Sequence, residues 1–127
     1  MAWYPCSIGG GNVGNAIKIN VQFRPDSTNQ INQHVYVYIT DLKNDQVVVN
    51  KLATAKLWTE SATASQDFTI DGKTYTVTQK RTPNSGNTSI QGLNVTIVDS
   101  KSIEVYKWSA NVSWNENYTY TDAIWIE

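Results

Sequence analysis

Cysteine, histidine and charge are all scarce in this chain of 127 residues. Cys6 is the only cysteine, so no disulfide can form within the chain and the fold depends on packing. His34 is the only histidine, which excludes a metal site built on two imidazoles. Charged residues make up 17% of the chain, and the only two basic residues that are adjacent in the sequence are Lys80 and Arg81. We therefore expect no nucleic-acid partner, because the sequence offers no basic footprint for phosphates.

Long apolar runs are absent as well. No stretch approaches the ~20 apolar residues that a membrane-spanning helix needs. Residues 1–5 show no basic region followed by an apolar run, so no signal peptide is recognised. The location stays open between the cytoplasm, non-classical release and an extracellular site after processing. The length favours a single domain over residues 1–127.

Polar and apolar residues alternate along most of the chain, which is the pattern of strands with one buried face. The clearest run is 16–23, and further strands are expected over 34–40, 46–50, 93–97 and 118–126. Another long strand is expected over 103–114, and we predict a bulge in it because its apolar residues change face partway. Residues 52–64 fit a short helix as well as a strand.

The dipeptide Asp71-Gly72 lies between alternating runs and predicts a tight hairpin from about residue 66 to residue 80. About eight short strands separated by turns indicate an all-β fold. We predict a two-sheet antiparallel β-sandwich of immunoglobulin-like or jelly-roll type. No alternation of strands with helices is present, and no internal repeat of the propeller or solenoid kind is evident.

The motifs that would indicate catalysis or a cofactor are weak. The segment Gly9–Gly14 has the spacing of a dinucleotide-binding loop, but the clearest strand follows it where a helix is required. His34 lies in a strand without a recognisable nucleophile, and Cys6 has no charged neighbour to activate it. Asp41 and Asp45 lack the remaining ligands of a calcium loop, so we expect a self-capping turn there. We predict a protein that is not an enzyme and has no cofactor or metal.

Aromatic and amide side chains are concentrated in the last third of the chain. Alternation places Tyr106, Trp108 and Trp114 on one face of a strand, and the polar turn 115–117 can expose a neighbouring ring. Rings that pack on the C–H face of a sugar, together with amides that bond its hydroxyls, are typical of carbohydrate recognition. We therefore predict a lectin-like domain that binds a glycan or glycoconjugate. The expected ligand-binding residues are Trp58, Trp114, Asn115, Glu116, Asn117, Tyr118 and Tyr120.

Two other functions fit the same sequence. The alternating stretch 54–82 is rich in Thr and Ser and has the pattern of a membrane-inserting β-hairpin, which would suit a pore-forming or defence toxin. Contact with a membrane is expected only under that alternative. A structural or adhesion module of a larger assembly is the other option, in which exposed strand edges join neighbouring copies in a homo-oligomer.

Overall fold

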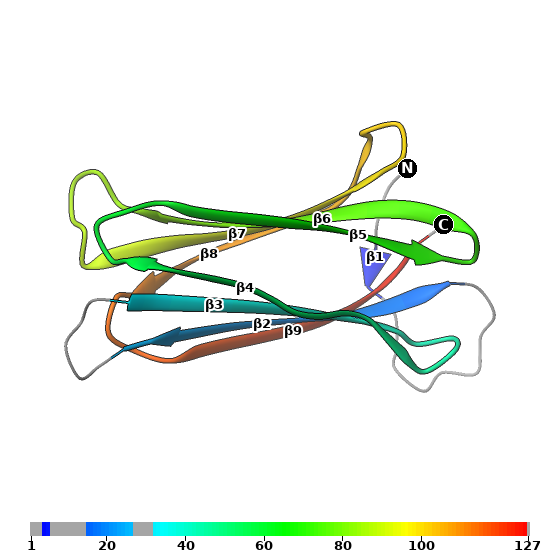
Figure 1. The fold of residues 1–127 in the computed structure, drawn as a ribbon, viewed down its shortest axis with the longest axis horizontal. Helices are drawn as coiled ribbons and strands as arrows, with labels where there is room; N and C mark the ends of the chain where they lie inside the picture. Colours follow the sequence, from blue (N-terminus) through cyan, green and yellow to red (C-terminus); the bar gives the residue numbers. More distant parts are fainter. Residues whose placement is uncertain (1–3, 6–14, 27–31, 127) are drawn as a thin grey trace.

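The alternating stretches form strands that pack as two antiparallel sheets (Figure 1). This arrangement comes from a computed structural model that describes residues 4–5, 15–26 and 32–126. Within these residues the strands are β1 (Tyr4–Pro5), β2 (Ala16–Pro25), β3 (Asn32–Asp41), β4 (Gln46–Leu57), β5 (Ala62–Ile70), β6 (Lys73–Pro83), β7 (Ile90–Asp99), β8 (Glu104–Ser113) and β9 (Tyr118–Trp125). The described residues contain no helix with the length and hydrophobicity that crossing a bilayer would demand.

One sheet has the strand order β1-β9-β2-β3-β4, and the other has the order β5-β6-β7-β8. The predicted two-sheet antiparallel sandwich is therefore confirmed. All neighbouring strands of the sheet β5-β6-β7-β8 are consecutive in the chain, whereas in the other sheet β2, β3 and β4 are consecutive and β9 returns to lie beside β2. The second sheet is therefore a meander of four consecutive strands, which occurs neither in the immunoglobulin-like order nor in the Greek keys of a jelly roll. Strand order could not be inferred from alternation, which gives no information about pairing.

The core lies between the sheets and is formed by the inward member of each alternating pair. Its fully buried residues include Ile17, Ile19, Phe23, Val37, Ile39, Val77, Val95, Ile97 and Ile124. The predicted hairpin is confirmed: β5 and β6 are joined at Asp71 and Gly72, whose φ angles of 51° and 77° suit a two-residue turn. The predicted bulge in β8 is also present, where Val105 and Tyr106 are both buried and the register shifts.

The segment left open over 52–64 continues β4, turns at residues 58–60 and begins β5. The Thr- and Ser-rich stretch 54–82 thus forms the end of β4 and the β5–β6 hairpin. In the hairpin the apolar residues Phe68, Tyr75 and Val77 are buried in the core, and the alternate hydroxyl residues face outward. Core packing of this hairpin accounts for the alternation in the stretch.

The two halves of the chain are structural repeats, a feature that the sequence did not reveal. The first repeat comprises β2 to β5, and the second comprises β6 to β9. Pro25 pairs with Gln33 between β2 and β3, and Pro83 pairs with Gln91 between β6 and β7. The identical residues at matched positions include Pro25 and Pro83, Gln33 and Gln91, Val37 and Val95, Ile39 and Ile97, Asp41 and Asp99, Trp58 and Trp114, and Glu60 and Glu116.

The repeats exchange their last strands. β9 of the second repeat pairs with β2 of the first, and β5 of the first pairs with β6 of the second. The registers match: Phe23 lies opposite Tyr118, and the equivalent Arg81 lies opposite Ala62. The turns match as well, since Asp41 accepts a hydrogen bond from the Lys43 amide and Asp99 accepts one from the Lys101 amide. The sandwich therefore has approximate two-fold symmetry, and each repeat crosses between the sheets once.

Candidate functional site

The two crossovers lie at the same end of the sandwich (Figure 1). In both, a tryptophan is followed two residues later by a glutamate. After β4 the chain runs Trp58-Thr59-Glu60, and after β8 it runs Trp114-Asn115-Glu116. Each turn is closed by the same backbone hydrogen bond, from Glu60 N to Leu57 O at 3.0 Å and from Glu116 N to Ser113 O at 3.3 Å. Two equivalent turns therefore bring one tryptophan from each repeat to this end.

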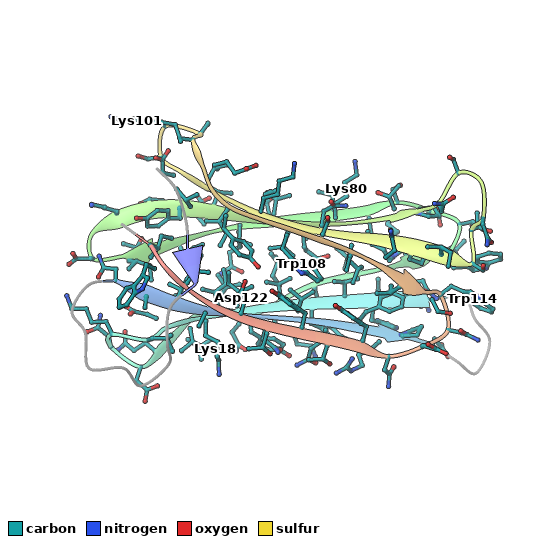
Figure 2. All side chains as sticks on the ribbon, turned by 180° about the vertical axis from the view of Figure 1, so that it is seen from behind. Lys18, Lys80, Lys101, Trp108, Trp114 and Asp122 are labelled. Carbon is teal, nitrogen blue, oxygen red and sulfur yellow. The ribbon has the colours of Figure 1, made fainter. Side chains whose placement is uncertain are left out.

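Trp58 and Trp114 contact each other across the approximate two-fold axis. Their ring centroids are 5.4 Å apart and the ring planes are tilted by 34°. Both side chains are only half-buried, so part of each ring faces solvent. Figure 2 shows Trp114 at the end of the molecule, where β8 passes into β9. The structure thus places two of the sequence-predicted binding residues in one aromatic pair, which we call the tryptophan pair.

A shallow hollow of about 180 Å³ lies in the second repeat at the passage from β8 to β9. Its lining consists of Asn111, Val112, Ser113, Glu116, Asn117 and Tyr118. Most of these groups offer hydrogen bonds, and the only charged one is the carboxylate of Glu116. Pockets that enclose a small molecule usually have volumes of about 300–1,000 Å³, so this hollow can receive only one small unit of a ligand.

The hollow is lined by three of the predicted residues, Glu116, Asn117 and Tyr118. Trp114 directly follows Ser113 of the lining in the chain, which brings the tryptophan pair next to the hollow. Asn115 is exposed in the same turn, and its side-chain oxygen accepts a hydrogen bond from Ser113 Oγ at 2.8 Å. Tyr120 lies elsewhere: it faces inward from β9 and stacks on Trp108 with 4.7 Å between the centroids. Tyr120, which the sequence analysis predicts as a ligand-binding residue, therefore lies outside the hollow.

Sequence reasoning missed the part of the hollow that comes from the end of β8, namely Asn111, Val112 and Ser113. Asn111 and Ser113 alternate with the buried Val112, so the alternation of polar and apolar residues assigned them only to the solvent-facing side of a strand. Their nearness to the predicted turn was the available signal, since side chains at a strand end lie beside the turn that follows.

Buried polar side chains hold the Trp58 turn from inside the sandwich. The fully buried Arg81 donates to Leu57 O at 3.0 Å and to Glu60 O at 2.8 Å, and it also bonds Gln91 Oε1. Gln91 in turn donates from Nε2 to Trp58 O at 3.1 Å. Burial lowers the pKa of Arg81, and the charge of Glu60 opposes that shift. An arginine remains charged under these conditions, so its donors fix the carbonyls of this turn.

A second aromatic group fills the open side of the sandwich between β8 and β9. Trp108 points between the sheets and stacks on Tyr118 as well as Tyr120 (Figure 2). Tyr106 and Tyr120 both donate to Asp122 Oδ2, each at 3.2 Å. Burial raises the pKa of both hydroxyls above the ordinary value near 10, and the Asp122 carboxylate adds to the shift. The folded state therefore favours neutral phenols here.

We expect this pair of tyrosines to make the protein less stable in alkali. A pKa that is higher in the folded state than in the unfolded state contributes stability below the unfolded value, and this contribution is lost as pH rises above it. The urea midpoint should fall between about pH 9 and about pH 11, and the fall should be smaller for Tyr106→Phe. An equal fall in both proteins would show that Tyr106 does not carry the effect.

The remaining sequence candidates occupy structural positions. His34 faces outward on β3 and stacks on Tyr36, with 6.2 Å between the ring centroids. Asp41 caps its own turn as predicted, since it accepts hydrogen bonds from the amides of Lys43 and Asn44. Among the described residues no group of three or more His, Cys, Asp or Glu side chains is arranged to hold a metal. Cys6 and the segment Gly9–Gly14 lie outside the described residues.

Comparison with known proteins gave no relative: no family model matches the chain, and neither a curated protein nor a solved structure shows significant similarity to it.

Proposed function

We propose that this domain is a non-catalytic carbohydrate-binding module, and that it binds one terminal sugar unit at the tryptophan pair and the adjoining hollow. The observation that supports this most is the half-exposed Trp58–Trp114 pair beside a hollow lined by amide and hydroxyl groups. A tryptophan face can pack on the apolar C–H face of a pyranose, while Asn111, Asn117 and Ser113 can bond the hydroxyls.

The chemistry of the hollow favours a neutral sugar over an acidic one. Glu116 is the charged residue of the lining, and no Lys or Arg contributes to it. A carboxylate or sulfate on the ligand would meet a like charge without a basic partner, which selects against acidic sugars. Because the hollow encloses little of the ligand, binding of a single unit should be weak, and strong attachment would require several units presented together.

Binding can be tested by calorimetric titration with the methyl glycosides of glucose, galactose, mannose and N-acetylglucosamine. The expected result is measurable binding of at least one, and affinity at least about tenfold lower for Trp114→Ala and Trp58→Ala, since central aromatic residues dominate such sites. Trp125→Ala is the matched control, because Trp125 lies at the other end of β9 and should leave the affinity unchanged. No binding of any of the four, or equal binding by Trp114→Ala, would refute the proposal.

A further inference from the structure

The two tryptophan turns are equivalent in backbone but differ in what holds them. Beneath the Trp58 turn, Arg81 and Gln91 donate to the carbonyls of Leu57, Glu60 and Trp58. These bonds reach from the second repeat across the sandwich to the turn of the first. By the approximate two-fold symmetry, the Trp114 turn should receive the same bonds from the first repeat.

The equivalent residues of the first repeat are Phe23 and Gln33. Phe23 occupies the register position of Arg81, and its side chain has no donor. Gln33 occupies the position of Gln91 and is fully buried, but neither Nε2 nor Oε1 has a hydrogen-bond partner among the described residues. Arg81 donates to Gln91 Oε1. Because residue 23 is a phenylalanine, no guanidinium is present to donate to Gln33 Oε1 in the same way. Gln91 Nε2 donates to Trp58 O at 3.1 Å and to Thr88 O at 2.7 Å, so the unpaired Nε2 of Gln33 lacks the matching bond to Trp114 O. The residue matched to Thr88 is Gln30, which lies outside the described residues.

An unpaired buried amide is costly, and sites where one persists call for an explanation. Within the part of the chain that the structure describes, the symmetry of the molecule supplies one partner, the carbonyl of Trp114. A small inward movement of the Trp114 turn would let Gln33 Nε2 donate to that carbonyl, as Gln91 does for Trp58. The same movement would displace the Trp114 ring, because the ring belongs to the turn that moves.

We infer that Gln33 is a positioning residue for Trp114: the Trp58 turn is fixed, the Trp114 turn is adaptable, and Gln33 holds the Trp114 turn in its ligand-bound position. This inference rests on the proposed sugar site. It adds Gln33 as the buried residue that sets the position of the Trp114 ring. The ligand is thereby bound between one rigid and one adjustable tryptophan. In the free protein Gln33 contributes nothing to the stability of the turn.

The variants Gln33→Met and Gln91→Met test this, because methionine keeps nearly the same volume and removes both polar atoms. In the free protein Gln91→Met should lower the urea midpoint, since it removes the bond to Trp58 O and leaves Arg81 Nη1 without its acceptor, although Arg81 Nη2 keeps its bonds to Leu57 O and Glu60 O. Gln33→Met should leave the midpoint unchanged or raise it, because it replaces an unpaired amide. Equal losses of stability in the two variants would show that Gln33 is already bonded and would overturn the inference.

A second measurement concerns the turns themselves and needs no ligand. Amide hydrogen exchange should be slower at Glu60 than at Glu116, although both amides close the same type of turn. Equal protection of the two amides would contradict the difference in rigidity. Exchange at Glu116 should slow further when the wild-type protein is saturated with the methyl glycoside that it binds.

The binding measurement separates this inference from the proposed function. For whichever of the four methyl glycosides the wild-type protein binds, Gln33→Met should weaken binding about tenfold, the effect of losing one hydrogen bond worth about 1.4 kcal/mol. Sugar binding that is equal in Gln33→Met and the wild type would overturn the role of Gln33 and leave the sugar site standing. Absence of sugar binding by the wild type would refute both.

Discussion

Replacement of Arg81 with methionine should lower the free energy of unfolding by about 3 kcal/mol, the range measured when one member of a buried polar network is removed. Arg81 is fully buried and donates to Leu57 O, Glu60 O and Gln91 Oε1. Methionine fills much of the same space without any donor, so the buried Gln91 Oε1 and the part-buried carbonyls of Leu57 and Glu60 lose their partner. The Trp58 turn should become mobile as a result.

Arg24→Met is the matched control for this prediction. Arg24 is only half-buried and donates to Phe23 O and Tyr118 O at the rim of the other sheet. Its loss should cost less than about 1 kcal/mol, because water can replace the guanidinium there. Urea unfolding of the three proteins, followed by tryptophan fluorescence, measures the difference. A cost for Arg81→Met as small as that for Arg24→Met would contradict the account of the buried network.

The variants Ile39→Ala and Ile97→Ala should each lose about 3 kcal/mol of stability, within the range for large-to-small core substitutions. Ile39 and Ile97 occupy equivalent positions in the two repeats, on β3 and β7, and both are fully buried. The cost of such a cavity depends on how well its surroundings can collapse. Equivalent surroundings should therefore give nearly equal losses, and calorimetric unfolding measures both.

The comparison is informative because the local sequences differ. Ile39 lies between Tyr38 and Thr40, whereas Ile97 lies between Thr96 and Val98. If local sequence controlled the cost, the two variants would differ. Losses that differ by more than about 1 kcal/mol would indicate that the cores of the two repeats have diverged in packing, although their strand registers agree.

The sandwich could be predicted from the sequence because each strand carries its own signal. Ile17, Ile19 and Val21 alternate with polar residues, and Asp71-Gly72 marks a turn in which both residues have positive φ. The β8 bulge was also predictable, since Val105 and Tyr106 break the alternation and are both buried. These signals depend on residues close together in the sequence.

The pairing of distant segments could not be predicted in the same way. The tryptophan pair needs the two crossovers to lie at one end, and this depends on strand order. The repeat was difficult to recognise in the sequence because β4 has 12 residues and β8 has 10. Matched positions are therefore not separated by a constant number of residues along the chain. Outward residues also differ between the repeats, as Tyr36 and Asn94 do, because only the core face is constrained by packing.

The interior polar residues were missed for another reason. Gln33, Arg81 and Gln91 occupy inward positions of their strands, where alternation predicts apolar residues. Arg81 and Gln91 donate to backbone carbonyls of the β4–β5 crossover, which no side-chain pattern reports, and Gln33 has no partner among the described residues. The candidate residues Trp114, Glu116, Asn117 and Tyr118 lie close together in the sequence and could be proposed from residue type, but the contact of Trp58 with Trp114 could not.

The most direct test of the sugar site is a heteronuclear magnetic resonance titration that follows the indole N–H signals of the tryptophans as each methyl glycoside is added. The signals of Trp58 and Trp114 should shift together with a common dissociation constant, while those of Trp108 and Trp125 stay in place. Shifts confined to Trp108 or Trp125, or no shift with any of the four sugars, would contradict the assignment of the site to the tryptophan pair.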